Sequence, residues 1–229
     1  MKKVWRIRRG MQWFRGLQQL PYFWRTARRL DRDGFDQRHG TDTSRLMRTR
    51  AAAGYLVNRY ETAGTDAIER AIGGVGVDLS RFTFLDLGCG KGKPLLLAAG
   101  HPFRCLIGVD ISAPCLAIAR RNVERCGLGG RIELVHTDVT EYEAPAGPLF
   151  IYLFNPFPAR ILGLVLDRLV ARLVREREPI AIVYMNPEHA DVIDRSGCFR
   201  CVSDLPGEAS PYERTLVYVS TDPCGTAGH

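Results

Sequence analysis

Short apolar runs alternate with helical stretches over residues 82–220, and this alternation restricts the fold more than any other feature of the sequence. A strand that is followed by a helix and a further strand of the same sheet lies parallel to that strand, with a right-handed crossover. We therefore expect an α/β fold with a doubly wound, mainly parallel, seven-stranded sheet. The predicted strands are 82–88, 104–110, 131–138, 148–157, 179–187, 198–205 and 214–220, and the predicted helices between them are 92–101, 113–127 and 159–177.

The last two predicted strands are separated only by residues 206–213, which are too few for a crossover helix of the usual kind. We expect a hairpin there, with one antiparallel strand at the C-terminal end of the sheet. Upstream, residues 43–76 predict helical cover with a break near 60–65. The chain is expected to divide into an N-terminal helical segment (1–50), a main domain (51–222) and a flexible tail (223–229).

The net charge of +7 is concentrated near the N-terminus. Residues 1–50 hold 14 Lys and Arg against 4 Asp and Glu, whereas the other 179 residues carry a net charge of −3. This asymmetry suggests an anionic partner for the N-terminal segment without identifying it. The segment also has an apolar stripe at helical spacing, which either docks on the domain or joins the partner contact. The stripe consists of Trp13, Leu17, Leu20 and Trp24.

Composition indicates where the protein works and whether it binds a metal. No apolar run approaches the roughly 18 residues of a spanning helix, so we expect no integral membrane segment. Seven scattered cysteines without a secretory signal favour reduced thiols and a cytoplasmic protein, with peripheral membrane contact left open. Cys198 and Cys201 have the spacing of half a zinc site, but there is no second pair and no His at ligand spacing. We therefore expect no metal.

Asp86 and three glycines at alternate positions follow the first predicted strand, in the sequence DLGCGKG. Each glycine costs about 0.5–1 kcal/mol of stability, which suggests that something approaches the main chain closely. Nucleotide-like ligands bind at this edge of an α/β sheet. A dinucleotide fingerprint would need a small residue where Lys93 stands, and a Walker loop would need Ser or Thr where Pro94 stands. The pattern that remains is D-x-G-x-G-x-G.

This pattern resembles the first motif of the class I S-adenosylmethionine (SAM) methyltransferases, and the resemblance extends over about residues 55–220. It implies a Rossmann-like fold and SAM as the cofactor. It also implies that the glycine loop passes under the methionine part of SAM, while the acidic residue supports the loop and the ammonium group. The matching positions are Asp86, Gly88, Cys89, Gly90 and Gly92.

Two further motifs follow in the order of that family, each at the end of a predicted strand. GVDIS resembles the second motif and implies that Asp110, followed by Ile111, binds the two ribose hydroxyls. HTDVT resembles the third and implies that Asp138 lies near the adenine amino group, with Val139 as a backbone contact. A chance glycine turn with two surface aspartates explains these positions poorly.

The fourth predicted strand ends in Asn155, Pro156 and Phe157, which resemble the [DNS]-P-P-[YF] motif of amino-group methyltransferases with one proline missing. The resemblance implies that the Asn side-chain oxygen and the Pro carbonyl hold two N–H groups of the acceptor, while the aromatic ring packs on the substrate. An in-line displacement of this kind depends on positioning and needs no strong base. The alternative is that Asn155 caps the next helix and Pro156 opens its first turn.

Residues 59–72 resemble the loop and helix before the first motif in non-SET histone lysine methyltransferases and in small bacterial relatives. In those enzymes a Tyr and a Thr close over the carboxylate end of the cofactor. The matching positions here are Tyr60, Thr62 and Thr65, although Ala63 stands where relatives often carry proline.

Residues 35–46 resemble the entry segment of the same small methyltransferases. The resemblance implies that His39 and Asp42 lie over the pocket. The alternative for these two polar residues is that they cap local turns.

The motifs favour an enzyme that transfers a methyl group from SAM, with nitrogen as the expected acceptor atom. The acceptor itself stays open between an amine such as a protein lysine, a small metabolite methylated on N or O, and RNA. A second class of function uses the fold as a scaffold and binds nucleic acid or a membrane surface through the basic, aromatic residues 1–30.

Overall fold

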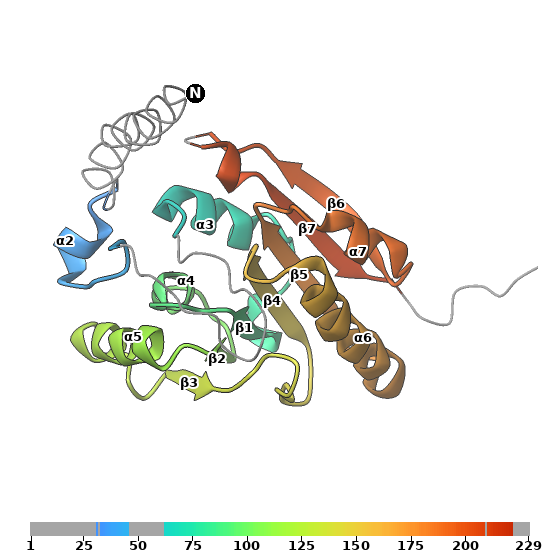
Figure 1. Ribbon diagram of the computed structural model, residues 1–229, viewed down its shortest axis with the longest axis horizontal. Helices are drawn as coiled ribbons and strands as arrows, with labels where there is room; N and C mark the ends of the chain where they lie inside the picture. The colour runs from blue at the N-terminus through green and yellow to red at the C-terminus, as the bar shows by residue number, and fades with distance from the viewer. Residues whose placement is uncertain (1–30, 32, 46–61, 209, 222–229) are drawn as a thin grey trace, which may run out of the picture.

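A computed structural model describes residues 31, 33–45, 62–208 and 210–221. Its centre is a seven-stranded sheet with the strand order β3-β2-β1-β4-β5-β7-β6 (Figure 1). Strands β1 to β5 are parallel, and β7 is antiparallel to both of its neighbours. The predicted fold is thereby confirmed, including the antiparallel C-terminal strand. The strands are β1 (Thr83–Leu87), β2 (Cys105–Asp110), β3 (Ile132–His136), β4 (Leu149–Phe154), β5 (Ile180–Met185), β6 (Phe199–Leu205) and β7 (Thr215–Ser220).

Each strand begins and ends within a few residues of its prediction, and the helices are somewhat shorter than predicted. The helix α7 was not predicted, because it has only six residues and a single buried side chain. The predicted stripe at 13–24 and residues 46–61 of the predicted helical cover lie outside the described residues. The helices are α2 (Phe35–His39), α3 (Thr65–Gly73), α4 (Lys93–Ala98), α5 (Ala113–Arg125), α6 (Ala159–Glu176) and α7 (Ala190–Arg195), with 3-10 turns η1 (Leu79–Arg81) and η2 (Pro211–Glu213).

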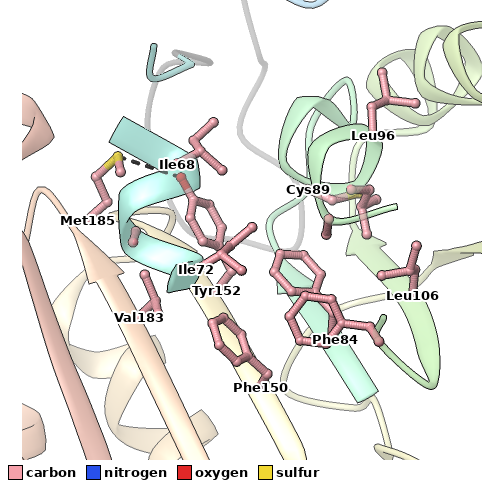
Figure 2. Packing of buried hydrophobic residues seen from close by; sticks show 14 of the residues in the cluster. Ile68, Ile72, Phe84, Cys89, Leu96, Leu106, Phe150, Tyr152, Val183 and Met185 are labelled. Atoms are coloured by element: carbon pink, nitrogen blue, oxygen red, sulfur yellow. Dashed lines mark hydrogen bonds between the residues drawn. The ribbon is translucent and has the colours of Figure 1, made fainter. Parts of the chain in front are cut away.

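Two hydrophobic clusters cover the two faces of the sheet because the side chains of each strand alternate between them. One cluster joins the sheet to α3, α4 and α5, and it is built around three stacked aromatic rings, Phe84, Phe150 and Tyr152. Figure 2 shows Tyr152 pointing from β4 toward Met185 of β5, to whose sulfur its hydroxyl donates at 3.6 Å. The other cluster joins the sheet to α6 and α7. The carboxyl ends of β1, β2 and β4 therefore meet at one edge between two filled layers.

Among the described helices, none is long and apolar enough to cross a lipid bilayer.

Candidate cofactor and acceptor site

The glycine loop between β1 and α4 turns back on itself by alternating into left-handed backbone conformations. Gly88, Gly90 and Gly92 have φ angles of 85°, 52° and 85°. Residues other than glycine rarely adopt such positive φ angles. The N–H groups of Gly88 and Cys89 both donate to the carbonyl of Val109, at 2.8 and 3.1 Å. A Cβ added to Gly88 would lie 2.6 Å from Cβ of Pro156. The loop thus touches the Asn-Pro turn after β4, and Gly88 has room for nothing larger.

A fourth glycine, Gly108 in the middle of β2, supports this loop and was missed in the sequence. A Cβ at this position would lie 2.5 Å from Leu95 of α4 and 2.9 Å from the sulfur of Cys89. Cys89 is itself buried in the cluster that joins the sheet to α4. A glycine inside a strand is the available signal, since it marks a close approach by another segment.

Asp86 lies near the end of β1, and the residue is 2% exposed. Its Oδ2 atom has no hydrogen-bond partner among the described residues. Burial, together with the nearby charge of Asp110, raises the pKa of Asp86 well above its ordinary value. A buried carboxylate oxygen that accepts no hydrogen bond costs free energy, because it has lost its hydration. This atom therefore favours a ligand that is cationic or carries N–H groups.

Asp110 ends β2 and is tied to the glycine loop. Its two carboxylate oxygens accept the N–H groups of Gly90 and Ser112, at 2.8 and 2.7 Å. Burial raises the pKa of Asp110 in spite of these hydrogen bonds. Each oxygen of a carboxylate has a second acceptor site, so a diol can still bind here. The neighbouring Ile111 carbonyl lies 3.0 Å from Nε2 of His136.

Asp138 follows β3 and closes a local turn. One of its carboxylate oxygens accepts the N–H and the hydroxyl of Thr140, at 2.9 and 2.8 Å. Val139 is buried in the cluster on the α6 side. This loop is attached to the end of β2 because the N–H of Thr137 donates to the Asp110 carbonyl at 3.3 Å.

Asn155 has a φ angle of 38°, which is unusual for a residue other than glycine, and it is 6% exposed. The helix α6 begins at Ala159 with Pro158 as its N-cap residue, so the alternative interpretation of Asn155 as the helix cap is wrong. Its Oδ1 atom accepts the hydroxyl of Tyr184 at 3.2 Å. Phe157 is buried in the cluster on the α6 side.

Of the residues predicted to close over the cofactor, one lies outside the described residues and two lie at or just before the start of α3. Tyr60 lies outside the described residues, and Thr62 is partly buried just before α3. The N–H and hydroxyl of Thr65 both donate to Oδ2 of Asp33, each at 2.6 Å. Thr65 therefore binds a protein carboxylate in this structure.

The entry segment is held by lysines that the sequence did not single out. Asp42 forms an ion pair with Lys91 at 2.9 Å, and the Lys91 side chain is wholly buried. The His39 ring packs against Phe35 with 4.6 Å between their centroids. Among the described residues, no three His, Cys, Asp or Glu side chains converge as a metal site would require.

The carboxyl ends of β1, β2 and β4 thus bring together the glycine loop, two carboxylates and the Asn-Pro turn. Residues 84–160, which contain all of them, match the protein-family model described as a methyltransferase domain. Residues 84–160 thus carry a methyltransferase domain, which supports a class I SAM-dependent methyltransferase.

Curated relatives share this methyltransferase domain over a limited segment. The chain is 35% identical to ribosomal protein L11 methyltransferase of Edwardsiella ictaluri over 83 residues, which are 32% of this chain and 28% of the relative. It is 35% identical over 83 residues to a tRNA (guanine-N(7)-)-methyltransferase of Levilactobacillus brevis, covering 34% and 38% of the two chains. It is 32% identical over 94 residues to an rRNA N(6)-adenosine-methyltransferase of Caenorhabditis elegans, covering 40% and 42%. The match thus spans less than half of each relative.

Solved structures share the fold of this methyltransferase domain over a larger part of the chain. Ribosomal protein L11 methylase of Lactobacillus delbrueckii superposes with a TM-score of 0.50 at 16% identity, covering 69% of this chain and 77% of that one. The tRNA methyltransferase TrmK of B. subtilis superposes with a TM-score of 0.51 at 13% identity, covering 70% and 68%. At these identities the likeness supports the fold alone.

Proposed function

We propose that this protein is an enzyme that transfers a methyl group from SAM to a nitrogen atom of an amine, such as a protein lysine. The observation that carries the proposal is the buried Asp86 carboxylate, whose Oδ2 has no partner among the described residues, in the strand that leads into the glycine loop, where Gly88 has no room for a side chain. Asp110 stands close enough to raise the pKa of Asp86. A site with these two carboxylates, one of which has an oxygen without a partner among the described residues, favours a ligand that is cationic and also carries hydroxyls, which is the chemistry of SAM.

The residues at this edge fit the cofactor in a simple division of roles. The loop of Gly88, Gly90 and Gly92 would bind the methionine part, with Asp86 supporting the loop and the ammonium group. The second acceptor sites of the Asp110 oxygens would bind the ribose hydroxyls. Asp138 and Val139 would flank the adenine. SAM, when bound, supplies a methyl group on a sulfonium sulfur that is a good leaving group.

Asn155 is the residue that we expect to orient the acceptor. Asn155 is buried, and it lies beside the glycine loop because the next residue, Pro156, packs against Gly88. The hydroxyl of Tyr184 donates to Oδ1 at 3.2 Å and holds the orientation of the amide. We expect the side-chain oxygen of Asn155 and the Pro156 carbonyl to accept the N–H groups of an amine, so that the amine lone pair points along the line of displacement.

Within methyl transfer, RNA and small metabolites are the other acceptor classes. The relatives named above are a ribosomal protein methyltransferase, a tRNA methyltransferase and an rRNA methyltransferase, so they do not favour one class. A binding protein on a methyltransferase scaffold is not favoured. An anionic partner for residues 1–50, a cytoplasmic location and peripheral membrane contact stay predictions from the sequence.

The test is a turnover assay with labelled SAM and pools of protein, RNA and metabolites, followed by a matched pair of variants. Asn155→Ala should lower kcat by about 10²-fold, equivalent to about 2.7 kcal/mol, with little change in SAM affinity. Asn155→Asp keeps an acceptor oxygen and should retain more activity.

Asn186 offers the control, because it also precedes a proline and has a φ angle of 50° after the neighbouring strand β5. Its amide donates to the exposed Glu188 at 3.3 Å. Asn186→Ala should keep nearly full turnover. Equal losses in the two alanine variants, or full turnover in Asn155→Ala, would contradict the role of Asn155.

A further inference from the structure

Lys91 and Lys93 flank the last glycine of the loop, and both are buried against the N-terminal segment 33–45. Nζ of Lys91 lies 2.9 Å from Oδ1 of Asp42 and 2.6 Å from the carbonyl of Arg45. Nζ of Lys93 lies 2.8 Å from Oδ2 of Asp33 and 3.0 Å from the carbonyl of Ala63. Each ammonium group is therefore bound by one carboxylate and one carbonyl that precede the loop in the chain.

These two ion pairs are less favourable in free energy than apolar packing at the same positions would be. Taking an ammonium group out of water costs several kcal/mol, and a pair of apolar side chains of similar volume would avoid that cost. Lys93 also begins α4, where the helix dipole disfavours a positive charge. A buried ion pair defines how two segments lie against each other, because the two charges meet only when the segments are correctly aligned. Here the two segments are the glycine loop and residues 33–45. The lysines therefore point to a requirement for the exact placement of the loop against residues 33–45.

Asn122 of α5 makes a third connection between the same two segments. Its amide accepts the N–H of Asp42 at 2.9 Å and donates to the carbonyls of Asp42 and Lys91 at 3.2 and 3.1 Å. On its other side the loop is bound through the N–H of Gly90 to Asp110. The backbone from Gly90 to Lys91 is thus held from both sides, by the carboxylate that we propose for the ribose and by the N-terminal segment.

We propose that Lys91 and Asp42 are positioning residues for the cofactor. Their ion pair holds the glycine loop in its left-handed conformation, so that SAM binds tightly only when residues 33–45 are docked on the loop. Neither residue needs to touch the cofactor, and Lys93 with Asp33 reinforces the same docking. The inference rests on the proposed function.

The test is calorimetric titration of SAM into the wild-type chain and into Lys91→Met, Asp42→Asn and the double variant. Each single variant should bind SAM about tenfold more weakly, which corresponds to about 1.4 kcal/mol. The double variant should be no weaker than the single ones, because both changes break one interaction. Lys91→Arg, which keeps the charge, should recover part of the affinity.

Arg125→Ala provides the matched control. Arg125 donates to the carbonyl of Gly40 at 2.8 Å from an exposed position, so its loss removes a contact to the same segment without touching the loop. This variant should bind SAM as the wild-type chain does.

Hydrogen exchange on the wild-type chain tests the inference even where a variant fails to fold. The N–H of Asp42 donates to Asn122 of α5, and the N–H groups of Thr43 and Ser44 donate to Asp36 within the docked segment. SAM should slow their exchange together with that of the loop amides. Protection confined to the loop, or folded Lys91→Met and Asp42→Asn variants with wild-type affinity, would overturn the inference alone. A wild-type chain that binds no SAM would instead overturn the proposed function.

Discussion

The pKa values of Asp33 and Asp36 in the N-terminal segment and those of Asp86 and Asp110 at the ends of β1 and β2 are shifted in opposite directions. Burial alone would raise the pKa of Asp36, but hydrogen bonds from Ser44, Thr41 and Thr43 lower it to about 2. Hydrogen bonds from Lys93 and Thr65 likewise outweigh burial at Asp33 and hold its pKa far below its ordinary value.

At the ends of the strands burial prevails. The pKa of Asp86 and that of Asp110 are both raised, first by burial, and at Asp86 also by the charge of Asp110. The difference distinguishes structural carboxylates from those that we propose to bind the ligand. The N-terminal segment satisfies its own charges with donors of the chain, whereas Asp86 has a buried oxygen that a cationic ligand would satisfy.

The largest effect on stability is expected from Asp36→Ala. Asp36 accepts the side-chain hydroxyls of Thr41, Thr43 and Ser44 as well as the N–H groups of Thr43 and Ser44. Losing an acceptor of this kind should lower the free energy of unfolding by about 3 kcal/mol, since hydrogen bonds to a charged group contribute about 1.5–3 kcal/mol and are not additive. Urea unfolding measures the change, and a loss below about 1 kcal/mol would contradict the structural role of Asp36.

Asp86→Asn should change stability in the opposite direction. The amide keeps the shape of the carboxyl group and removes its buried charge, so the unliganded protein should gain about 1–2 kcal/mol against urea. The same variant should bind SAM at least about tenfold more weakly, which is about 1.4 kcal/mol. A variant that is less stable and binds SAM normally would show that Asp86 is an ordinary structural carboxylate.

The dependence of stability on pH gives a smaller effect with opposite signs in the two regions. The lowered pKa of Asp36 gives stability that is present above its ordinary value of 3.8 and is lost as the pH falls toward about 2. The raised pKa of Asp86 means that the folded protein holds a proton that the unfolded chain releases. Its contribution to stability is therefore full below pH 3.8 and declines as the pH rises above that value.

Unfolding experiments from pH 2 to pH 8 on the wild-type chain and the two variants measure these contributions. The gain from Asp86→Asn should shrink as the pH falls toward about 4, and the loss from Asp36→Ala should shrink toward pH 2. Two difference curves of the same sign would refute the contrast between the regions.

The sheet was predictable from the sequence because the buried strands are short apolar runs and the glycine loop marks where the first one ends. The interpretation of Asn155 as a cap failed because three residues separate it from α6. The sequence does not reveal that Pro156 packs on Gly88, a contact between segments almost seventy positions apart.

The partners of the loop lysines were missed for a similar reason. Lys91 and Asp42 are 49 positions apart, and Lys93 and Asp33 are 60 positions apart. In the sequence Lys91 belongs to the glycine loop and Lys93 to the start of the predicted helix 92–101, and at both places a charged side chain is ordinarily solvated. Only the tertiary structure buries them and reveals their partners.

Calorimetric titration of SAM into the wild-type chain and into Asp110→Ala tests the central claim most directly, because Asp110 joins the glycine loop to the proposed ribose site. The account predicts that the wild-type chain binds SAM, that NAD does not compete, and that the folded variant binds at least about tenfold more weakly. Wild-type protein that binds no SAM, or a folded Asp110→Ala variant with unchanged affinity, would contradict it.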